Sequence, residues 1–251
     1  MIDYNPTPQD REQLQRDGYL LVRGLVNAAG VERLLRWTTQ LQTEPEVTGR
    51  HWIYREDSLT KPPRRIVQRI ENFCPFHEGF DGFVRQGALV EWTSALMGGQ
   101  VVLFKDKINF KMPGGTGFKL HQDQQAGWGS YAPLFITAMV SLDTASVASG
   151  CLEIAAGRHR EGLIGEPWQP LDETGIDLKA VPTAPGDVIF FDSYVPHASK
   201  ANFSESPRRI LYLTYNLADD GDHRARYYAD KYAAFPPDID RNPAQTYVFR
   251  V

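Results

Sequence analysis

The chain has very little cysteine and no long apolar run. Its 251 residues include only two cysteines, Cys74 and Cys151, too few for the disulfide framework of a small secreted domain. We expect two free thiols in a reducing compartment, with one disulfide between them as the alternative. No stretch approaches the roughly 20 apolar residues that cross a bilayer, and residues 1–6 lack the basic start and apolar run of a signal peptide. These absences predict a soluble, cytoplasmic protein with no membrane partner.

An excess of positive charge is also absent. The 27 lysines and arginines are outnumbered by 31 aspartates and glutamates, which gives a net charge of -4. A protein that follows nucleic-acid phosphates needs a basic stripe, so we exclude nucleic acid as a partner. The sequence does not indicate an oligomeric state.

The first hundred residues have the patterns of helices. Thr7-Pro8 is typical of an N-cap followed by proline in the first turn, and it begins a helix that we expect to end near Asp17-Gly18. Apolar residues then repeat at helical spacing over residues 31–41. A third helix is predicted over Phe83–Met97, closed by Gly98-Gly99.

The next 120 residues look like strands. Short runs with strand composition are bounded by Gly, Pro, Asp or Asn. They are Val101–Phe104, Lys107–Phe110, Phe135–Val140, Cys151–Ile154, Val188–Phe191 and Ile210–Tyr215. This segregation predicts an α+β fold, a β-sandwich or barrel buttressed by N-terminal helices, and the length predicts one domain over residues 1–251. The irregular segments 43–65 and 157–180 are typical of lids or binding loops.

The most informative short pattern is His121-Gln122-Asp123, followed 74 residues after Asp123 by His197 and eleven residues later by Arg208. If residues 120–123 are extended, His121 and Asp123 leave the same face of the strand and can bind one metal ion. Two imidazoles and one carboxylate on one face of an iron ion leave three positions open. Arg208 enters a strongly apolar strand, where a guanidinium is costly without an acidic partner, so it can hold an acidic co-substrate. Together these residues indicate an oxygen-activating hydroxylase.

A second pair with the same spacing, His159-Arg160-Glu161, competes for the role of metal-binding pair. Only 36 residues separate Glu161 from His197, which leaves room for about three or four strands, whereas the interval after Asp123 allows more. The longer interval better suits a sandwich that returns a distant strand beside the first. We therefore favour the pair that ends in Asp123 and expect His159 in a loop.

With these residues in place, the chain resembles the phytanoyl-CoA dioxygenase family of iron(II)- and 2-oxoglutarate-dependent oxygenases. The resemblance runs from about Gly18 to beyond Asn216. The family pattern of His-x-Asp, a distal His and an Arg eleven residues after it falls on His121, Asp123, His197 and Arg208. The resemblance implies a double-stranded β-helix, a jelly roll with the metal between its sheets. It also implies a dioxygenase that uses Fe(II), 2-oxoglutarate and O2, and that releases succinate and CO2 as it hydroxylates a substrate.

The resemblance also assigns expected contacts to the co-substrate. Arg208 would bind the 5-carboxylate of 2-oxoglutarate, and Ser199, two residues after the distal histidine, would donate a hydrogen bond to the same carboxylate. Lys107 and Asn109 lie in a segment that lines the 2-oxoglutarate pocket in ectoine-hydroxylase-like relatives, and we expect them as further contacts.

Several longer motifs are similar to a narrower branch, the one that contains 2-aminoethylphosphonate hydroxylases. These motifs are His121–Trp128, Arg69–Asn72, Phe190–His197, Tyr227–Tyr232 and Phe235–Asp238. The resemblance implies phosphonate catabolism, with hydroxylation of the carbon next to phosphorus. A phosphonate dianion needs cationic donors, and an ammonium group is attracted by aromatic faces. The candidate substrate residues are Lys119, Arg158, Arg160, Trp128 and Gln122, with a solvated basic loop and plain aromatic packing as alternatives.

Two other functions stay open at this point. One is a hydroxylase of a coenzyme A thioester, which the broader family name suggests and which would need a groove for a long acyl chain. The other is a jelly-roll module that binds a metal ion or ligand without chemistry.

Overall fold

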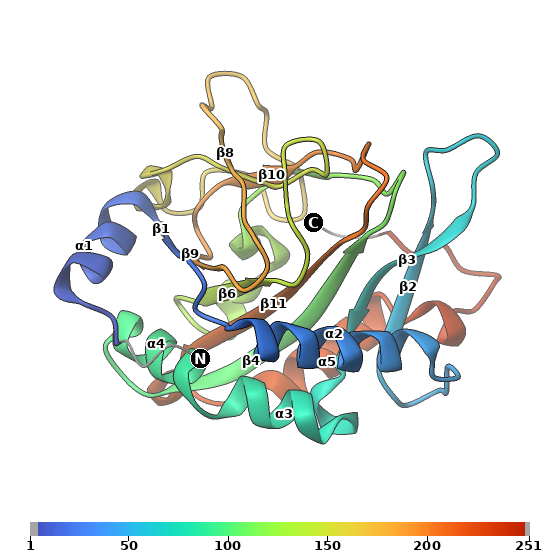
Figure 1. Ribbon diagram of the computed structural model, residues 1–251, viewed down its shortest axis with the longest axis horizontal. Coiled ribbons are helices and arrows are strands. Elements are labelled where there is room, and N and C mark those ends of the chain that lie inside the picture. The colour runs from blue at the N-terminus through green and yellow to red at the C-terminus, as the bar shows by residue number, and fades with distance from the viewer. Residues whose placement is uncertain (1–4, 249–251) are drawn as a thin grey trace.

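A computed structural model describes residues 5–248, which form two antiparallel sheets that face each other, with helices along the outer face of the larger sheet (Figure 1). The seven strands of the larger sheet are, in spatial order, β1 (Tyr19–Val22), β9 (Val188–Asp192), β6 (Ile136–Ser141), β11 (Arg208–Leu217), β4 (Val101–Lys111), β3 (Arg65–Glu71) and β2 (Trp52–Asp57). The four strands of the smaller sheet are, in spatial order, β5 (Phe118–His121), β10 (His197–Ser199), β7 (Leu152–Ile154) and β8 (Lys179–Val181). Most neighbours are distant in sequence, as β11 is from β4, so the strands are wound as a jelly roll.

The helices begin and end where local chemistry dictates. They are α1 (Pro8–Asp17), α2 (Ala28–Thr43), α3 (Glu78–Arg85), α4 (Ala88–Met97) and α5 (Arg224–Ala234). The side chain of Thr7 accepts a hydrogen bond from the amide of Asp10, and Gly18 ends α1 in the left-handed conformation with φ of 78°. The predicted first helix is therefore confirmed at both ends.

The prediction of one long helix over Phe83–Met97 is wrong. The structure has two helices there, because α3 ends at Arg85 and α4 begins at Ala88. Between them Gly87 has φ of 76° and ψ of -163°, a conformation that is open to glycine and not to residues with a Cβ atom. The apolar spacing continues across this break, which is why the sequence pattern did not reveal it.

The runs predicted as separate strands at Val101–Phe104 and Lys107–Phe110 are one strand, β4. The charged residue between them, Asp106, is buried and does not interrupt the strand because its carboxylate is satisfied. It accepts hydrogen bonds from the amides of Phe73 and Cys74, at 2.7 and 2.9 Å, and forms an ion pair with Arg224 of α5. A further strand, β2, lies inside the segment 43–65 that was expected to be irregular.

The two faces of the larger sheet have separate apolar cores. Ile108 and Phe110 of β4 pack with α2, α3 and α4, whereas Met139, Ile189 and Ile210 pack against the smaller sheet. Because side chains alternate along a strand, the remaining residues of β4, at 105, 107, 109 and 111, face the space between the sheets. The lysine side chains of β4 therefore point toward the space between the two sheets.

Two expectations from composition meet the structure here. Cys74 and Cys151 are both buried free thiols, as expected. Within residues 5–248, no helix combines the length and the apolar character that crossing a membrane requires.

Candidate active site

Three side chains that the sequence analysis selected as metal ligands meet between the two sheets. His121 is the last residue of β5, Asp123 begins the short 3-10 helix η2 (Asp123–Ala126), and His197 begins β10. His197 lies directly opposite His121 in the ladder of the smaller sheet. One ligand atom from each of the three residues lies within 4.8 Å of the others. The arrangement is a facial set of two imidazoles and one carboxylate, which suits iron(II).

The two histidines are held in the tautomer that a metal ion needs. Nδ1 of His121 lies 2.7 Å from the carbonyl oxygen of Lys119, and Nδ1 of His197 lies 3.0 Å from that of Val195. Since a carbonyl only accepts, each Nδ1 carries the proton and each Nε2 keeps its lone pair for the metal. Burial, together with the neighbouring His197, lowers the pKa of His121 to about 3, so that its ring is neutral at physiological pH.

The extended conformation considered for residues 120–123 continues through Gln122, with φ of -106° and ψ of 138°, and ends at Asp123. The strand ends at His121 and the chain turns into η2, yet Nε2 of His121 and Oδ1 of Asp123 are still only 3.9 Å apart. Gln122 points away from the other two, as expected, and its side chain is fully buried.

The amide group of Gln122 joins three loops. Its Nε2 donates to the carbonyl oxygens of Gly162 and Tyr194, at 2.7 and 2.6 Å, and its Oε1 accepts from the amide of Ile164 at 2.9 Å. Gln122 does not line the pocket described below, so its observed role is to hold the ligand-bearing loop against its neighbours.

Arg208 is fully buried at the start of β11, and its guanidinium has no partner among residues 5–248. None of Nε, Nη1 and Nη2 has a hydrogen-bond acceptor within reach there. A buried cation without an anionic partner is strongly unfavourable, so the position requires an acidic ligand. The planar fork of Arg208 fits the 5-carboxylate of 2-oxoglutarate.

Lys111 and Ser199 lie at the same end of the site. Lys111 is the ladder partner of Arg208, and its Nζ donates to Oγ of Ser199 at 2.7 Å, which links the larger sheet to the smaller one. Burial and the charge of Arg208 lower the pKa of Lys111 to about 6. Asn109, two residues before Lys111, is also buried, and its Oδ1 has no partner in the described part of the chain. This cluster of polar groups suits a bound carboxylate better than an apolar ligand.

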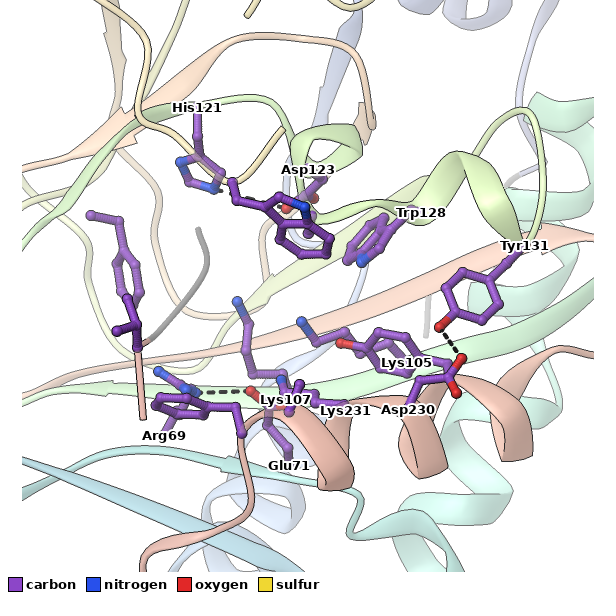
Figure 2. Close-up of a pocket in the computed structure, with 17 residues that line it drawn as sticks. Arg69, Glu71, Lys105, Lys107, His121, Asp123, Trp128, Tyr131, Asp230 and Lys231 are labelled. Carbon is purple, nitrogen blue, oxygen red and sulfur yellow. Dashed lines mark hydrogen bonds and ion pairs between the residues drawn. The ribbon is translucent and has the colours of Figure 1, made fainter. Parts of the chain in front are cut away.

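A pocket of about 150 Å³ adjoins the metal-binding residues, and His121 and Asp123 form part of its wall (Figure 2). Its basic lining residues are Arg69, Lys105, Lys107 and Lys231. Its aromatic lining residues are Phe118, Trp128, Tyr131, Trp168, Tyr227 and Phe235. In Figure 2 the lysines of β4 point upward toward His121 and Asp123, while Asp230 of α5 and Tyr131 close one end. A molecule in the pocket would therefore touch both the metal site and a cationic floor.

The charges in the floor are unevenly paired. The buried carboxylate of Glu71 accepts a hydrogen bond from Nε of Arg69 at 2.8 Å and forms an ion pair with Lys231. Burial alone would raise the pKa of Glu71, but the positive charges of Lys231, Lys105 and Arg69 outweigh it and hold this pKa well below its usual range. Burial, followed by the charge of Lys105, lowers the pKa of Lys107 to about 7.

This geometry is accompanied by a match to a known family. The profile of the family described as phytanoyl-CoA dioxygenase matches residues 14–210, which is more than half of the chain. The chain belongs to the phytanoyl-CoA dioxygenase family of iron(II)- and 2-oxoglutarate-dependent oxygenases. Its residues meet the needs of this chemistry, since the facial triad suits iron and the unpartnered Arg208 suits the co-substrate. The predicted enzyme class and the predicted cofactors are thus confirmed.

Two curated relatives of this dioxygenase are similar over nearly their whole length. This chain is 37% identical over 245 residues to the 2-aminoethylphosphonate dioxygenase of uncultured bacterium HF130_AEPn_1, and the match covers 96% of this chain and 93% of the relative. It is 33% identical over 238 residues to the methylphosphonate hydroxylase of Gimesia maris, covering 91% and 88%. A crystal structure of EctD from S. alaskensis with 2-oxoglutarate and 5-hydroxyectoine superposes with a TM-score of 0.72 at 21% identity, covering 88% of this chain and 79% of that one. This likeness confirms the predicted jelly roll.

The residues that were expected to contact substrate are only partly at the pocket of the dioxygenase. Trp128 lines it, but Lys119, Arg158 and Arg160 do not. Lys119 is exposed on β5, and Arg158 pairs with Glu161, with 2.8 Å between Nη2 and Oε2. These basic side chains belong to the outer surface, and the cations of the pocket come from β3, β4 and α5 instead.

The competing pair at 159–161 does not form a metal site. His159 lies on the 3-10 helix η4 (Arg158–Glu161), where its Nε2 is 3.2 Å from the carbonyl oxygen of Gln15, and Glu161 is paired with Arg158. The loop position expected for His159 agrees with this placement.

Lys105 and Lys111 were not predicted as site residues, although a signal was present. Both lie two residues from a residue that was selected, Lys107 or Asn109, and residues at i and i+2 of a strand share a face. Glu71 and Lys231 lie inside two of the motifs similar to the phosphonate branch, Arg69–Asn72 and Tyr227–Tyr232, but their pairing could not be predicted because they are separated by 160 residues and meet only in the folded chain.

We expect Glu71 to make the free energy of unfolding depend on pH. Its pKa is depressed in the folded state, so its contribution is complete above the unfolded value of about 4.3 and is lost as the pH falls below it. Thermal unfolding between pH 6 and pH 3 should show a shallower loss of melting temperature for Glu71→Gln than for the wild type. The exposed Glu91→Gln on α4 serves as the control. Equal slopes for Glu71→Gln and the wild type would contradict the assignment.

Proposed function

We propose that this dioxygenase hydroxylates a small organophosphonate, 2-aminoethylphosphonate or a close analogue, at the carbon next to phosphorus. The observation that carries the proposal is the cationic floor of a small pocket directly beside the metal ligands, formed by Arg69, Lys105, Lys107 and Lys231. A phosphonate carries up to two negative charges, and charge-assisted hydrogen bonds are the strong way to hold them. The names of the two curated relatives support the same substrate class. We further propose that residues 1–251 act as one cytoplasmic domain.

The protein's own contribution is to bind and orient the reactants. Iron(II), 2-oxoglutarate and O2 together supply the oxidation of a C–H bond to C–OH, with succinate and CO2 as the other products. His121, Asp123 and His197 would hold the iron, leaving three positions for the reactants. Arg208 and Ser199 would bind the far carboxylate of 2-oxoglutarate and thereby orient its other end toward the metal, with Asn109 as a further contact.

The pocket also limits what can react. Its aromatic rim, which includes Trp128 and Trp168, reduces the access of water to the substrate. A volume of about 150 Å³ suits a small molecule, and the charged floor of the pocket does not suit a long acyl chain. A module that binds a metal ion or ligand without chemistry would not need the complete set of reactant-binding residues. The pocket therefore favours the phosphonate hydroxylase over both alternatives.

The test is a coupled assay with the purified iron-loaded protein. We expect succinate to form in step with hydroxylated product when 2-oxoglutarate and 2-aminoethylphosphonate or methylphosphonate are supplied, and not with an acyl-CoA. The product is identified by phosphorus NMR, which detects the change at the carbon bonded to phosphorus. Turnover of acyl-CoA without turnover of any phosphonate would overturn the proposal. Iron and 2-oxoglutarate binding without turnover of any compound in a broad panel would favour the binding module.

A further inference from the structure

We propose that Lys105 and Lys107 form a subsite that selects doubly charged head groups, so that the enzyme prefers a phosphonate dianion to a singly charged analogue of the same shape. The inference deepens the proposed function and rests on it for the identity of the substrate. It assigns Lys107 to the substrate, where the family resemblance had suggested a contact to 2-oxoglutarate.

The first argument is the placement of the two lysines. They are two residues apart on β4 and therefore leave the same face of the strand, toward the space between the sheets. Both line the pocket whose opposite wall contains His121 and Asp123, and Figure 2 shows their side chains pointing to that wall. An anion held by both ammonium groups would lie next to the metal site.

The second argument is the pairing of charge. Of the four basic residues in the pocket, Arg69 and Lys231 converge on the carboxylate of Glu71. Lys105 and Lys107 have no carboxylate within ion-pair distance among residues 5–248, and the contacts found for their Nζ atoms are with aromatic rings. In the described part of the chain, two amino groups without a carboxylate partner thus face the pocket, which suits a dianion better than a monoanion.

The aromatic contacts hold these charges in position. Nζ of Lys105 lies 5.3 Å from the ring centroid of Trp128 and 5.7 Å from that of Tyr227. Nζ of Lys107 lies 4.6 Å from the ring centroid of Tyr212. The aromatic wall that was expected to attract an ammonium group of the substrate is therefore in contact with the protein's own Lys105. This occupation directs the anionic end of the substrate, rather than its amine, to this part of the pocket.

The subsite is separate from the place where 2-oxoglutarate is expected. Lys107 is the ladder partner of Tyr212, whereas Arg208 is the partner of Lys111. Arg208 and Tyr212 are four residues apart on β11, a distance of about 13 Å along an extended strand. Two anions can therefore bind on the same sheet at once, one beside Arg208 and one beside Lys107. The lowered pKa of Lys107 agrees with this picture, because a bound dianion would restore the charged form that burial disfavours.

The test compares Lys105→Met and Lys107→Met with the wild type, and uses Lys179→Met as a control because Lys179 is exposed on β8 away from the pocket. Methionine keeps the length of the side chain and removes the charge. Thermal unfolding is measured anaerobically on protein with iron(II) and 2-oxoglutarate, in the presence of methylphosphonate or of methanesulfonate, which has the same shape and one charge. We expect methylphosphonate to raise the melting temperature of the wild type and the control far more than methanesulfonate does. The two pocket variants should lose this difference.

Steady-state assays give the second readout. For each pocket variant, kcat/KM for the phosphonate substrate should fall by about 30-fold or more, as expected for the loss of a charge-assisted hydrogen bond in a buried site. The KM for 2-oxoglutarate should stay unchanged. Melting temperatures without ligand should be equal to or above that of the wild type, because an unpaired charge at a half-buried position is removed.

Each outcome bears on one idea. Retained selectivity for methylphosphonate over methanesulfonate in both variants would overturn the subsite, as would a rise in the KM for 2-oxoglutarate equal to the loss for phosphonate. If the wild type turns over no phosphonate, the proposed function fails, and the difference between the two ligands in thermal unfolding still decides whether the dianion subsite exists.

Discussion

The variant His121→Ala should lose 2-oxoglutarate-dependent succinate formation by well over about 100-fold. Replacing even an outer partner of a metal ligand typically costs about 10–100-fold in metal affinity or activity, so the loss of a ligand itself should exceed that range. The reason is geometric, because His121, Asp123 and His197 are the described histidines and acidic residues that converge as one group within 4.8 Å. Iron bound per protein chain after anaerobic loading, and succinate released in the coupled assay, should fall together.

The chain offers a matched control for this experiment. His159→Ala removes the histidine of the competing pair, which lies on η4 with its ring directed to the carbonyl oxygen of Gln15. This variant should keep its iron content and its turnover. If His121→Ala retained turnover while His159→Ala lost it, the iron site would have to be moved to the pair that ends in Glu161.

The variant Arg208→Met should become more stable and less active at the same time. Its guanidinium is fully buried and has no partner among the described residues, so a shorter, unbranched apolar side chain removes an unsatisfied charge from the core. Truncating the protein side of a buried charge pair costs about 2–5 kcal/mol of binding, which corresponds to a KM for 2-oxoglutarate raised by about 30-fold or more. Without ligand, the melting temperature of the variant should lie above that of the wild type.

The measurement that separates this explanation from a structural defect is thermal unfolding with and without 2-oxoglutarate. A ligand that binds only the folded state raises the melting temperature, so 2-oxoglutarate should stabilise the wild type and leave Arg208→Met nearly unchanged. Arg209→Met is the control, since Arg209 pairs with Asp143 at 2.8 Å and is only partly buried. It should retain the response to 2-oxoglutarate. An unchanged KM for 2-oxoglutarate in Arg208→Met would show that the co-substrate is held elsewhere.

The elements that local chemistry determines could be predicted from the sequence. The helix between Thr7 and Gly18 could be predicted because these two residues are its caps. The strands β9 and β11 could be predicted because they are apolar runs bounded by turn residues. The break at Gly87 could not be predicted, because it depends on a glycine conformation that the apolar pattern does not record. The continuity of β4 was also hidden, since Asp106 is buried only because Phe73, Cys74 and Arg224 satisfy it from distant parts of the chain.

The candidate site divides in the same way. His121, Asp123, His197 and Arg208 form a spaced pattern, and the structure brings the first three together and buries the fourth. The pocket charges depend on strand register and on the docking of α5, which bring Glu71 next to Lys231 across 160 residues. No local pattern encodes such a meeting. The basic residues that were expected to contact substrate, such as Arg158, were therefore poorer guides than the alternation of side chains along β4.

The hydrogen bonds of Gln122 have a consequence for how this active site can change. The segment that begins at Gly162 and Ile164 also carries Trp168, whose indole forms part of the pocket wall. The residue that anchors this segment sits between two metal ligands, and Gln125 anchors it again through the carbonyl oxygens of Glu166 and Gln169. Remodelling the rim to admit a larger substrate therefore strains the loop that presents Asp123. The pocket rim and the metal-binding loop are thus linked by the same hydrogen bonds. A redesign of the substrate range therefore requires a compensating change that keeps the iron bound.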